Sequence, residues 1–230
     1  MGKAIEAFAH QAGHNIIGIR QNNRISFTEF LKKLPSPPDV AIEFTQPEAA
    51  FQNVSNCLLA GIPIVCGTTG WNHQVPEAEE LCRKTHGALI ISSNFSIGVN
   101  IFFELNRQFG HVLSRFQEFK IIITETHHTE KKDMPSGTAV RLAEDLMGVR
   151  KDFTGWQLNS LKDSEEIPIF SSRIPGEVGS HTIYWASPIE QISIRHKALS
   201  REGFAKGAIL AAEFIFDKKG VFSMREVLKF

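Results

Sequence analysis

The first 95 residues alternate between amphipathic stretches of helical spacing and short apolar runs, and this alternation limits the folds open to the chain. Strands that are separated by helices pair in parallel, and helices cover both faces of such a sheet. Ser26 with Glu29, and Thr45 with Glu48, fit the capping-box pattern of a helix start. We therefore expect an α/β fold. The expected helices span residues 3–12, 26–34, 45–60 and 75–86, and the expected strands span 15–19, 40–44, 62–66 and 88–91.

The pattern changes after residue 97, where a long helix precedes a strand that leads into two adjacent histidines. The last two strands alternate only partly, which suits a sheet covered on one face. Residues 150–178 have no clear pattern and are expected to form an excursion or an oligomer contact. We predict a second, α+β domain with a mixed sheet. Its expected helices span 97–112 and 136–146, its strands span 118–126, 181–186 and 191–198, and a last apolar helix spans 204–216.

Composition excludes several classes of protein. The 25 Lys and Arg residues balance the 25 Asp and Glu residues, which argues against a nucleic-acid surface. No apolar run approaches the roughly 20 residues of a membrane span, and the N-terminus lacks a signal-peptide pattern. The three cysteines are odd in number and lack metal-ligand spacing, so we expect reduced thiols in a cytoplasmic protein.

Residues 125–139 gather the groups of a small-anion site. The adjacent histidines His127 and His128 can exchange protons near neutral pH, and Lys131 supplies a positive charge or a second proton donor. The Ser-Gly-Thr turn that begins at Ser136 opens a helix whose first backbone N–H groups can bind an anion. We expect a pocket for a small, negatively charged molecule that must be protonated.

The spacing His-His-x-x-Lys-x-Asp-x-Pro-Ser-Gly-Thr-Ala in this segment resembles the signature of the 4-hydroxy-tetrahydrodipicolinate reductase family, enzymes of bacterial diaminopimelate and lysine synthesis. The resemblance implies reduction of a small ring with two carboxylates by NADPH or NADH, in cytoplasmic homotetramers that assemble through the substrate-domain sheet. It also implies a Rossmann-like dinucleotide-binding domain (1–97 and 204–230) and a substrate-binding and oligomerisation domain (98–203).

The resemblance implies roles for individual residues of the motif. His127 would be the acid/base, and Lys131 would be a proton donor that also stabilises developing negative charge. Asp133 is expected to orient Lys131 or to shape the turn. Residues 196–201 resemble a further family segment, His-Lys-Ala-x-Ser-Arg, and are expected near the pocket or a hinge. The substrate carboxylates would be held by His128, Ser136, Gly137 and Thr138.

Cofactor contacts are implied in the first half of the chain. Gly67-Thr68-Thr69 follows a predicted buried strand, at the edge of the sheet where ligands bind in such folds, although the tripeptide alone is equally typical of a tight turn. Gly2 resembles the last glycine of the family's Gly-x-Gly-x-x-Gly turn. The earlier part of that turn and its strand do not occur in this sequence, so we expect a truncated start and weaker cofactor binding. The other implied contacts are Phe44, Thr45, Ser92, Ser93, Asn94 and Phe95.

Arg20 bears on the choice between NADH and NADPH. NAD enzymes of this fold bind the ribose 2′-hydroxyl with an acidic residue after the second strand, but here the chain reads Ile19-Arg20-Gln21. Arg20 can pair with the 2′-phosphate of NADP or stack on adenine, since guanidinium suits both. We hypothesise that the chain accepts or prefers NADPH; the alternative is a solvated surface arginine.

Two other hypotheses stay open. The first is a metal hydrolase that uses His127, His128 and Glu130. Adjacent histidines on one strand point to opposite faces, and no His-Glu-x-x-His pattern occurs, so we expect no metal site. The second is a non-catalytic or impaired homologue that binds a dicarboxylate without turning it over.

Overall fold

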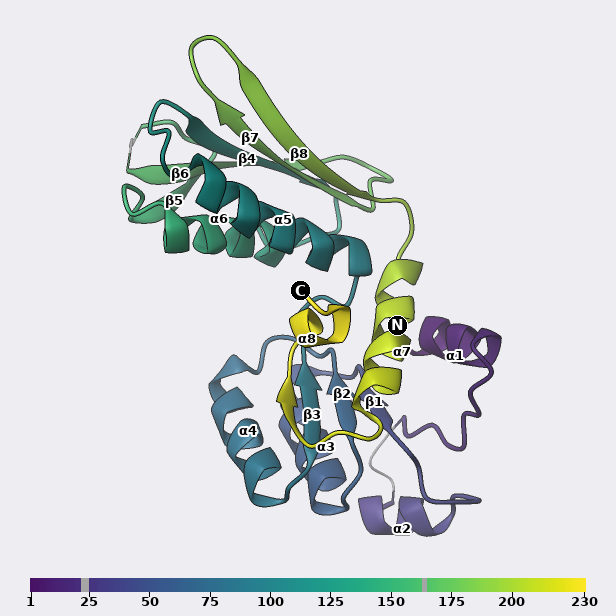
Figure 1. Cartoon of the computed structure of the whole chain (residues 1–230). Coiled ribbons are helices and arrows are strands. Elements are labelled where there is room, and N and C mark those ends of the chain that lie inside the picture. Colours follow the sequence, from purple (N-terminus) through teal and green to yellow (C-terminus); the bar gives the residue numbers. More distant parts are fainter. Residues whose placement is uncertain (22–24, 163–164) are drawn as a thin grey trace. The chain divides into compact units, whose positions relative to one another are not determined.

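The computed structural model describes every residue except 22–24 and 163–164, and the chain forms two compact units (Figure 1). The first unit contains Met1–Ile97 and Glu202–Phe230, and the second contains Gly98–Arg201. Each unit has its own sheet and its own buried apolar core. The end of the chain therefore returns to the unit that the beginning forms.

The first unit is built on a parallel sheet, as the alternation of helices and strands predicts. Its strand order is β1-β2-β3-β9, and every neighbouring pair is parallel. The strands are β1 (Ala41–Glu43), β2 (Ile64–Cys66), β3 (Ala88–Ile91) and β9 (Gly220–Phe222). The helical elements are α1 (Gly2–Gln11), α2 (Phe27–Lys32), α3 (Pro47–Leu59), η1 (Asn72–Gln74), α4 (Val75–Lys84), α7 (Glu202–Ile215) and α8 (Met224–Leu228).

Helices cover both faces of this sheet because successive strand residues point to opposite sides. Val65 and Ile90 belong to the core that includes residues of α1, α7 and α8. Ile64 and Leu89 belong to the core on the other face, with residues of α3 and α4 (Figure 1). The confirmed α/β class thus follows from strands that are apolar on both faces.

Two local predictions in this unit are wrong. Residues 15–19 do not form a strand: among the described residues, β1 is an edge strand that pairs with β2, and the run 15–19 has no hydrogen-bonding partner strand. Thr45 does not cap α3, which starts at Pro47 with Gln46 as its N-cap. The hydroxyl of Thr45 donates to the carboxylate of Glu43 instead. Proline at the first helical position lacks one of the backbone N–H groups that would otherwise stay without a partner at the helix start.

The second unit has the predicted mixed sheet, in the order β5-β6-β4-β7-β8. The central strand β4 pairs in parallel with β6 and antiparallel with β7. Both helices pack on one face of the sheet, around a core that includes Ile123 and Leu142 (Figure 1). The elements are α5 (Ile97–Leu113), β4 (Lys120–His127), α6 (Gly137–Val149), β5 (Gly155–Leu158), β6 (Glu166–Arg173), β7 (Gly179–Ala186) and β8 (Gln191–Ala198).

Strands β5 and β6 correct the expectation that residues 150–178 are irregular. The sequence hides them because β5 has only four residues and β6 contains Pro168, which counts against a strand. Pro168 lies opposite Gln157 in a parallel pair. Among the described residues, no helix has the length and apolar character needed to cross a bilayer.

Gly207 provides a test of how closely α7 packs in the first unit. A Cβ atom at Gly207 would lie 1.8 Å from the carbonyl oxygen of Phe95, whereas one at Gly203, in the first turn of the same helix, would meet only the Ser96 hydroxyl at 3.6 Å. We expect Gly207→Ala to lower the free energy of unfolding by about 2 kcal/mol or more, because the backbone must move. Gly203→Ala should leave it unchanged or raise it by up to about 1 kcal/mol.

Denaturant unfolding followed by circular dichroism measures both variants. Equal effects of the two substitutions would contradict the close approach of α7 to Phe95.

Candidate active site

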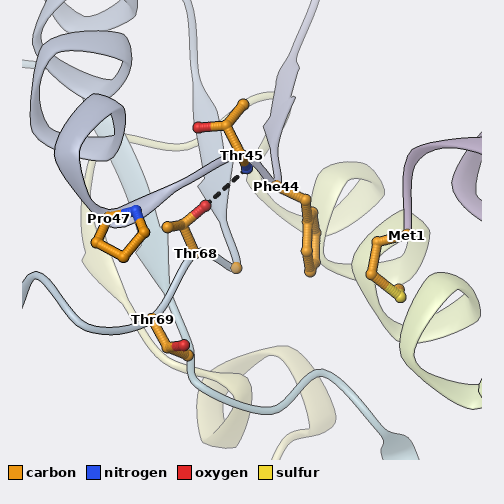
Figure 2. Close-up of a pocket in the computed structure, with 7 residues that line it drawn as sticks. Met1, Phe44, Thr45, Pro47, Thr68 and Thr69 are labelled. Carbon is orange, nitrogen blue, oxygen red and sulfur yellow. Dashed lines mark hydrogen bonds between the residues drawn. The ribbon is translucent and has the colours of Figure 1, made fainter.

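A pocket of about 330 Å³ lies at the carboxyl ends of β1 and β2 in the first unit (Figure 2). This is the edge of a parallel sheet at which ligands bind in doubly wound folds. The lining includes five of the residues that the resemblance assigns to the cofactor. The lining residues are Met1, Phe44, Thr45, Pro47, Gly67, Thr68 and Thr69.

Two contacts shape this pocket. The backbone N–H of Thr45 donates to the Thr68 hydroxyl at 2.8 Å and so joins the two strand ends (Figure 2). A Cβ atom at Gly67 would lie 2.2 Å from the ring of Phe44. Glycine at this position therefore lets the aromatic ring lie directly against the main chain.

Glu43 supports the pocket, and the sequence analysis missed it. Its carboxylate is buried and accepts hydrogen bonds from the Thr45 N–H at 3.1 Å, from the Asn53 amide at 3.4 Å and from the Cys66 thiol at 3.0 Å. Burial, followed by the negative charge of Glu43, raises the pKa of Cys66, which keeps the thiol protonated and able to donate. The sequence feature that could have identified Glu43 is a carboxylate near the end of an otherwise apolar predicted strand.

The remaining residues assigned to the cofactor do not line this pocket. Gly2 begins α1 with open space around it. The Arg20 guanidinium lies 5.8 Å from the centre of the Phe27 ring and donates to Asn53 at 3.4 Å. Its Nε atom is buried and has no hydrogen-bond partner in the part of the chain that the structure describes. Arg20 is thus half-buried rather than a fully solvated arginine.

The segment after β3 folds back on itself. The Ser92 hydroxyl donates to the carbonyl of Asn94 at 2.9 Å, whereas Ser93 is exposed. Phe95 is buried in the core, with its ring centre 5.7 Å from that of Phe44. Packing therefore explains Phe95 directly, and its contact with Phe44 connects it to the pocket wall.

The second unit gathers its polar groups on one face of β4. Side chains of a strand alternate, so Glu125 and His127 share the face that carries Ile123 into the core. The register places His181 of β7 opposite Glu125, and Arg173 of β6 opposite His127. This face therefore changes from apolar to polar toward the carboxyl end of β4.

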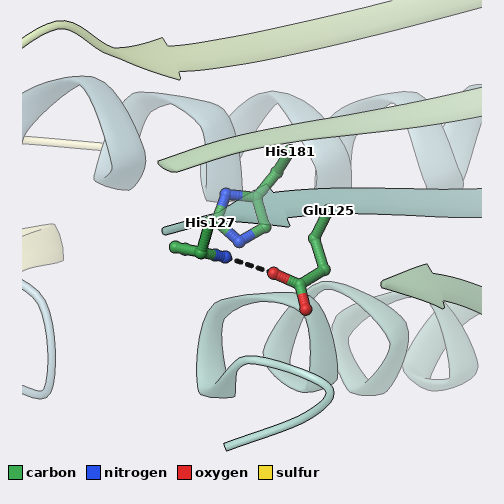
Figure 3. Close-up of side chains that lie close together, drawn as sticks. All are labelled: Glu125, His127 and His181. Carbon is green, nitrogen blue, oxygen red and sulfur yellow. Dashed lines mark hydrogen bonds and ion pairs between the residues drawn. The ribbon is translucent and has the colours of Figure 1, made fainter. Parts of the chain in front are cut away.

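Glu125 is the buried charge of this cluster. Nδ1 of His127 donates to one carboxylate oxygen (Figure 3), and Nη1 of Arg173 donates to the other at 3.0 Å. Burial raises the pKa of Glu125, but the hydrogen bonds from His127 and Arg173 outweigh it and lower the pKa to about 2. The carboxylate is therefore ionised near neutral pH, although no solvent reaches the side chain.

His181 connects the sheet to the start of α6. Its ring stands edge-on to His127 with the centres 5.0 Å apart, and its Nε2 lies 3.0 Å from the Ser136 hydroxyl. Ser136 is also the N-cap of α6, as predicted, and accepts from the N–H of Ala139. Burial, followed by the neighbouring His127, lowers the pKa of His181 to about 3, so the ring is neutral.

A carboxylate already lies at the predicted anion site. The Lys131 ammonium donates to Asp133 at 2.7 Å. Burial raises the pKa of Asp133, but Lys131 and the backbone N–H of Gly137 outweigh it and lower that pKa. Gly137 is exposed and Thr138 is half-buried, so the first amides of α6 lie near the surface. The start of α6 therefore stabilises a negative charge supplied by the chain itself.

His128 lies beside a residue that the sequence analysis gave no role. Arg201 Nη2 donates to His128 Nε2 at 3.3 Å. His128 Nδ1 is buried and lacks a hydrogen-bond partner among the described residues. The sequence did indicate Arg201 indirectly, because this residue ends the segment 196–201 that was expected near the pocket or a hinge. Because Nε2 accepts from Arg201, the donor of the neutral ring is the buried Nδ1, and the charge that the pair offers to an anion is that of Arg201.

The residues that could hold a metal ion in the structure differ from those of the metal hypothesis. Ligand atoms of Glu125, His127 and His181 lie within 4.8 Å of one another (Figure 3), whereas Glu130 is exposed. These atoms already make hydrogen bonds, Glu125 with His127 and His181 with Ser136. A metal would have to displace those bonds, so the arrangement favours proton chemistry.

His181 makes the stability of the second unit pH-dependent. Its pKa is about 3 in the folded chain and about 6.5 in the unfolded chain, so below pH 6.5 the unfolded chain binds a proton that the folded chain does not. The free energy of unfolding should therefore fall as the pH falls from 6.5 toward 3. His181→Gln, which can still bond Ser136, should remove up to roughly 1 kcal/mol per pH unit of that fall.

Urea unfolding of both proteins across this pH range measures the effect. Above pH 7, the difference in unfolding free energy between the wild type and His181→Gln measures the change in packing. The way this difference changes at lower pH measures the effect of protonating His181. A constant difference across the range would contradict the burial of a neutral His181.

Comparisons with known proteins give the same family as the motif. The family model "Dihydrodipicolinate reductase, N-terminus" matches residues 1–95, and "Dihydrodipicolinate reductase, C-terminus" matches 98–228. The chain is 40% identical to 4-hydroxy-tetrahydrodipicolinate reductase of Christiangramia forsetii, over 99% of this chain and 93% of the relative. It is 37% identical to the enzyme of the same name from Methanopyrus kandleri, over 93% of this chain and 80% of the relative.

Solved structures resemble the fold. A dipicolinate-bound dihydrodipicolinate reductase from Paenisporosarcina sp. TG-14 has a TM-score of 0.69 and 23% identity, over 91% of this chain and 81% of that one. An amine dehydrogenase from Mycobacterium smegmatis has a TM-score of 0.59 and 10% identity, over 97% and 92%. Both matches concern the fold alone. The two family models and the curated relatives confirm the prediction from the motif, and the chain belongs to the dihydrodipicolinate reductase family.

Proposed function

We propose that this chain reduces 4-hydroxy-tetrahydrodipicolinate to tetrahydrodipicolinate with NADPH or NADH, in diaminopimelate and lysine synthesis. One observation carries the chemistry. A histidine held by a buried carboxylate and a lysine ammonium lie in one unit with a helix start that already stabilises a carboxylate. Relatives named for this reaction support the substrate.

The first unit fits a nicotinamide cofactor, which supplies a hydride when it is bound. The pocket lies where such folds bind dinucleotides, and Gly67 lets the ring of Phe44 lie against the main chain of the pocket wall. Thr68 and Thr69 offer hydroxyl groups at the end assigned to the nicotinamide. Phe44 and Thr45 form the wall assigned to the adenosine ribose. Residues 1–97 and 202–230 thus form the cofactor-binding domain of our proposal.

The second unit supplies groups for both substrate carboxylates. The N–H groups of Gly137 and Thr138, with the Thr138 hydroxyl, would hold one carboxylate in place of Asp133. His128 and Arg201 would hold the other, since the Arg201 guanidinium lies beside the imidazole and donates to its Nε2. Both pairs exploit the double negative charge of the substrate, which explains why the site gathers donors.

His127 and Lys131 handle the proton. Nδ1 of His127 is engaged by Glu125, so Nε2 is the nitrogen that can give or take a proton. The Lys131 ammonium, paired with Asp133 in the structure, is a second donor and stabilises negative charge that develops on the reacting ring.

We also propose cytoplasmic homotetramers that assemble through the sheet of the second unit. The family resemblance supports this assembly. The helices α5 and α6 both pack on one face of that sheet, and the core residues of β4 point to that face. The opposite face is therefore the surface on which subunits would meet.

Removal of the two proton-carrying groups tests the reaction. We expect His127→Ala and Lys131→Ala each to lower kcat by roughly 10²- to 10⁴-fold, because each removes a proton-transfer group. Lys132→Ala is the matched control, since this exposed neighbour should retain wild-type turnover. The assay follows oxidation of NADPH with 4-hydroxy-tetrahydrodipicolinate as substrate. Unchanged turnover in His127→Ala would contradict the assigned role, and dicarboxylate binding without any wild-type turnover would identify a non-catalytic homologue.

Substitution of Arg20 tests the cofactor assignment. If Arg20 pairs with the 2′-phosphate of NADPH, Arg20→Ala should raise the KM for NADPH by roughly tenfold or more and change the KM for NADH little. Arg83→Ala, an exposed arginine of α4 in the same unit, is the control. Equal changes for the two cofactors would contradict a phosphate contact.

A further inference from the structure

We propose that Glu125 and Arg173 form a positioning pair that fixes both proton-carrying residues of the site, His127 and Lys131. Neither member of the pair is assigned a contact with substrate or cofactor. The roles of His127 and Lys131 rest on the proposed function, whereas the contacts of the pair are features of the second unit itself.

Glu125 is the centre of the arrangement. Its side chain has no solvent exposure, and each of its oxygens accepts a bond from a different partner. Oε2 accepts from Nδ1 of His127, and Oε1 accepts from Nη1 of Arg173 at 3.0 Å. A carboxylate without water is stable only with partners that compensate its charge. Displacing either partner would leave part of that charge uncompensated, so the pair resists movement.

The carboxylate also decides which nitrogen of His127 carries a proton. An ionised carboxylate can only accept hydrogen bonds, so the neutral ring must be protonated at Nδ1 and carry its lone pair at Nε2. Nε2 is then available for the proton of the reaction. A Cβ atom at Gly179 would lie 3.0 Å from Nε2, so the glycine keeps this edge of the ring uncovered.

Arg173 extends the same contact to Lys131. Its Nε donates to the Lys131 carbonyl at 3.4 Å, and its Nη2 donates to the Asp133 carbonyl at 2.6 Å. The guanidinium therefore holds the main chain on which the lysine side chain stands. A lysine at position 173 could not do this, because it lacks the planar fork of donors.

The two halves of the pair should fail in different ways. Without the carboxylate, His127 is no longer restricted to the Nδ1–H tautomer. Without the guanidinium fork, the main chain at Lys131 loses the hydrogen bonds that hold it. A residue with a purely structural role would alter neither the tautomer nor the rate of the chemical step. The nitrogen spectrum of His127 and the division of effects between kcat and KM therefore separate positioning from stability.

Glu125→Gln tests the first half at nearly constant size. Arg173 can only donate, so the carbonyl oxygen of the glutamine should face Arg173 and its NH2 group should donate to Nδ1. The ¹⁵N NMR spectrum of His127 in the ligand-free chain should therefore shift toward the Nε2–H form, where the wild type shows the Nδ1–H form. We expect kcat to fall roughly 10²-fold or more. KM should stay within about threefold, because the groups that hold the substrate are unchanged.

Arg173→Lys tests the second half, because it keeps the charge and loses the fork. We expect kcat to fall roughly tenfold while His127 keeps the Nδ1–H form. Arg150→Lys is the matched control. Arg150 is a buried arginine of the same unit, and its Nε and Nη2 donate to Asp152 at 2.8 and 2.6 Å. This variant should lower Tm without changing the tautomer or kcat.

A single Nδ1–H tautomer in Glu125→Gln, or a kcat within about twofold of wild type in Glu125→Gln or Arg173→Lys, would overturn the proposal. The spectrum is recorded without substrate, so it tests the pair even if the wild type reduces no dicarboxylate. If Glu125→Gln does not fold, Glu125→Asp replaces it. This variant keeps the charge but shortens the side chain, and the same loss of kcat is expected; wild-type kcat would overturn the proposal.

Discussion

The alternation of side chains along β4 is the constraint on which the second unit depends. Ile121 and Ile123 point into the core and are almost fully buried. Each such side chain contributes about 2 kcal/mol through removal from water. Glu125 and His127 continue on the same face, so the core and the site share one strand. The apolar half of β4 thereby stabilises the part of the strand that carries buried charge, which would be unfavourable alone.

The start of α6 connects that strand to the predicted anion site. Ser136 caps the helix and contacts His181, whose neutral ring stands against His127. A shift of α6 relative to the sheet would therefore disturb the contact between Ser136 and His181. Sites built on rigid elements hold their geometry more closely than sites on loops. His128, Lys131 and Asp133 lie in the irregular segment between β4 and the cap of α6, and Arg173 binds that segment from β6.

The sequence predicts well what local chemistry decides. Strands 88–91 and 191–198 have the bounds that periodicity predicts, and Ser136 caps α6 because an N-cap needs only its own side chain and the following amides. The sequence does not predict contacts that depend on strand register. Glu125 and Arg173 lie 48 residues apart and meet only because β6 pairs with β4, although β6 lacks a clear strand pattern. The roles assigned to the motif residues stay predictions, since geometry alone does not measure proton transfer.

Arginines bind both ends of β4, and the carboxylates that pair with these two arginines differ in burial. Before the strand, Arg150 donates to the Phe119 carbonyl at 3.2 Å and pairs with Asp152, whose side chain is 43% exposed. Near its carboxyl end, Arg173 pairs with Glu125, which is 0% exposed. Water reaches the carboxylate of the first pair, whereas in the second pair it reaches only Arg173, whose side chain is 12% exposed. A buried carboxylate costs more to pair than an exposed one, because it loses its hydration. Glu125 differs from Asp152 in a further way, because it also binds a histidine, and the positioning role that we propose for Glu125 depends on that shared contact.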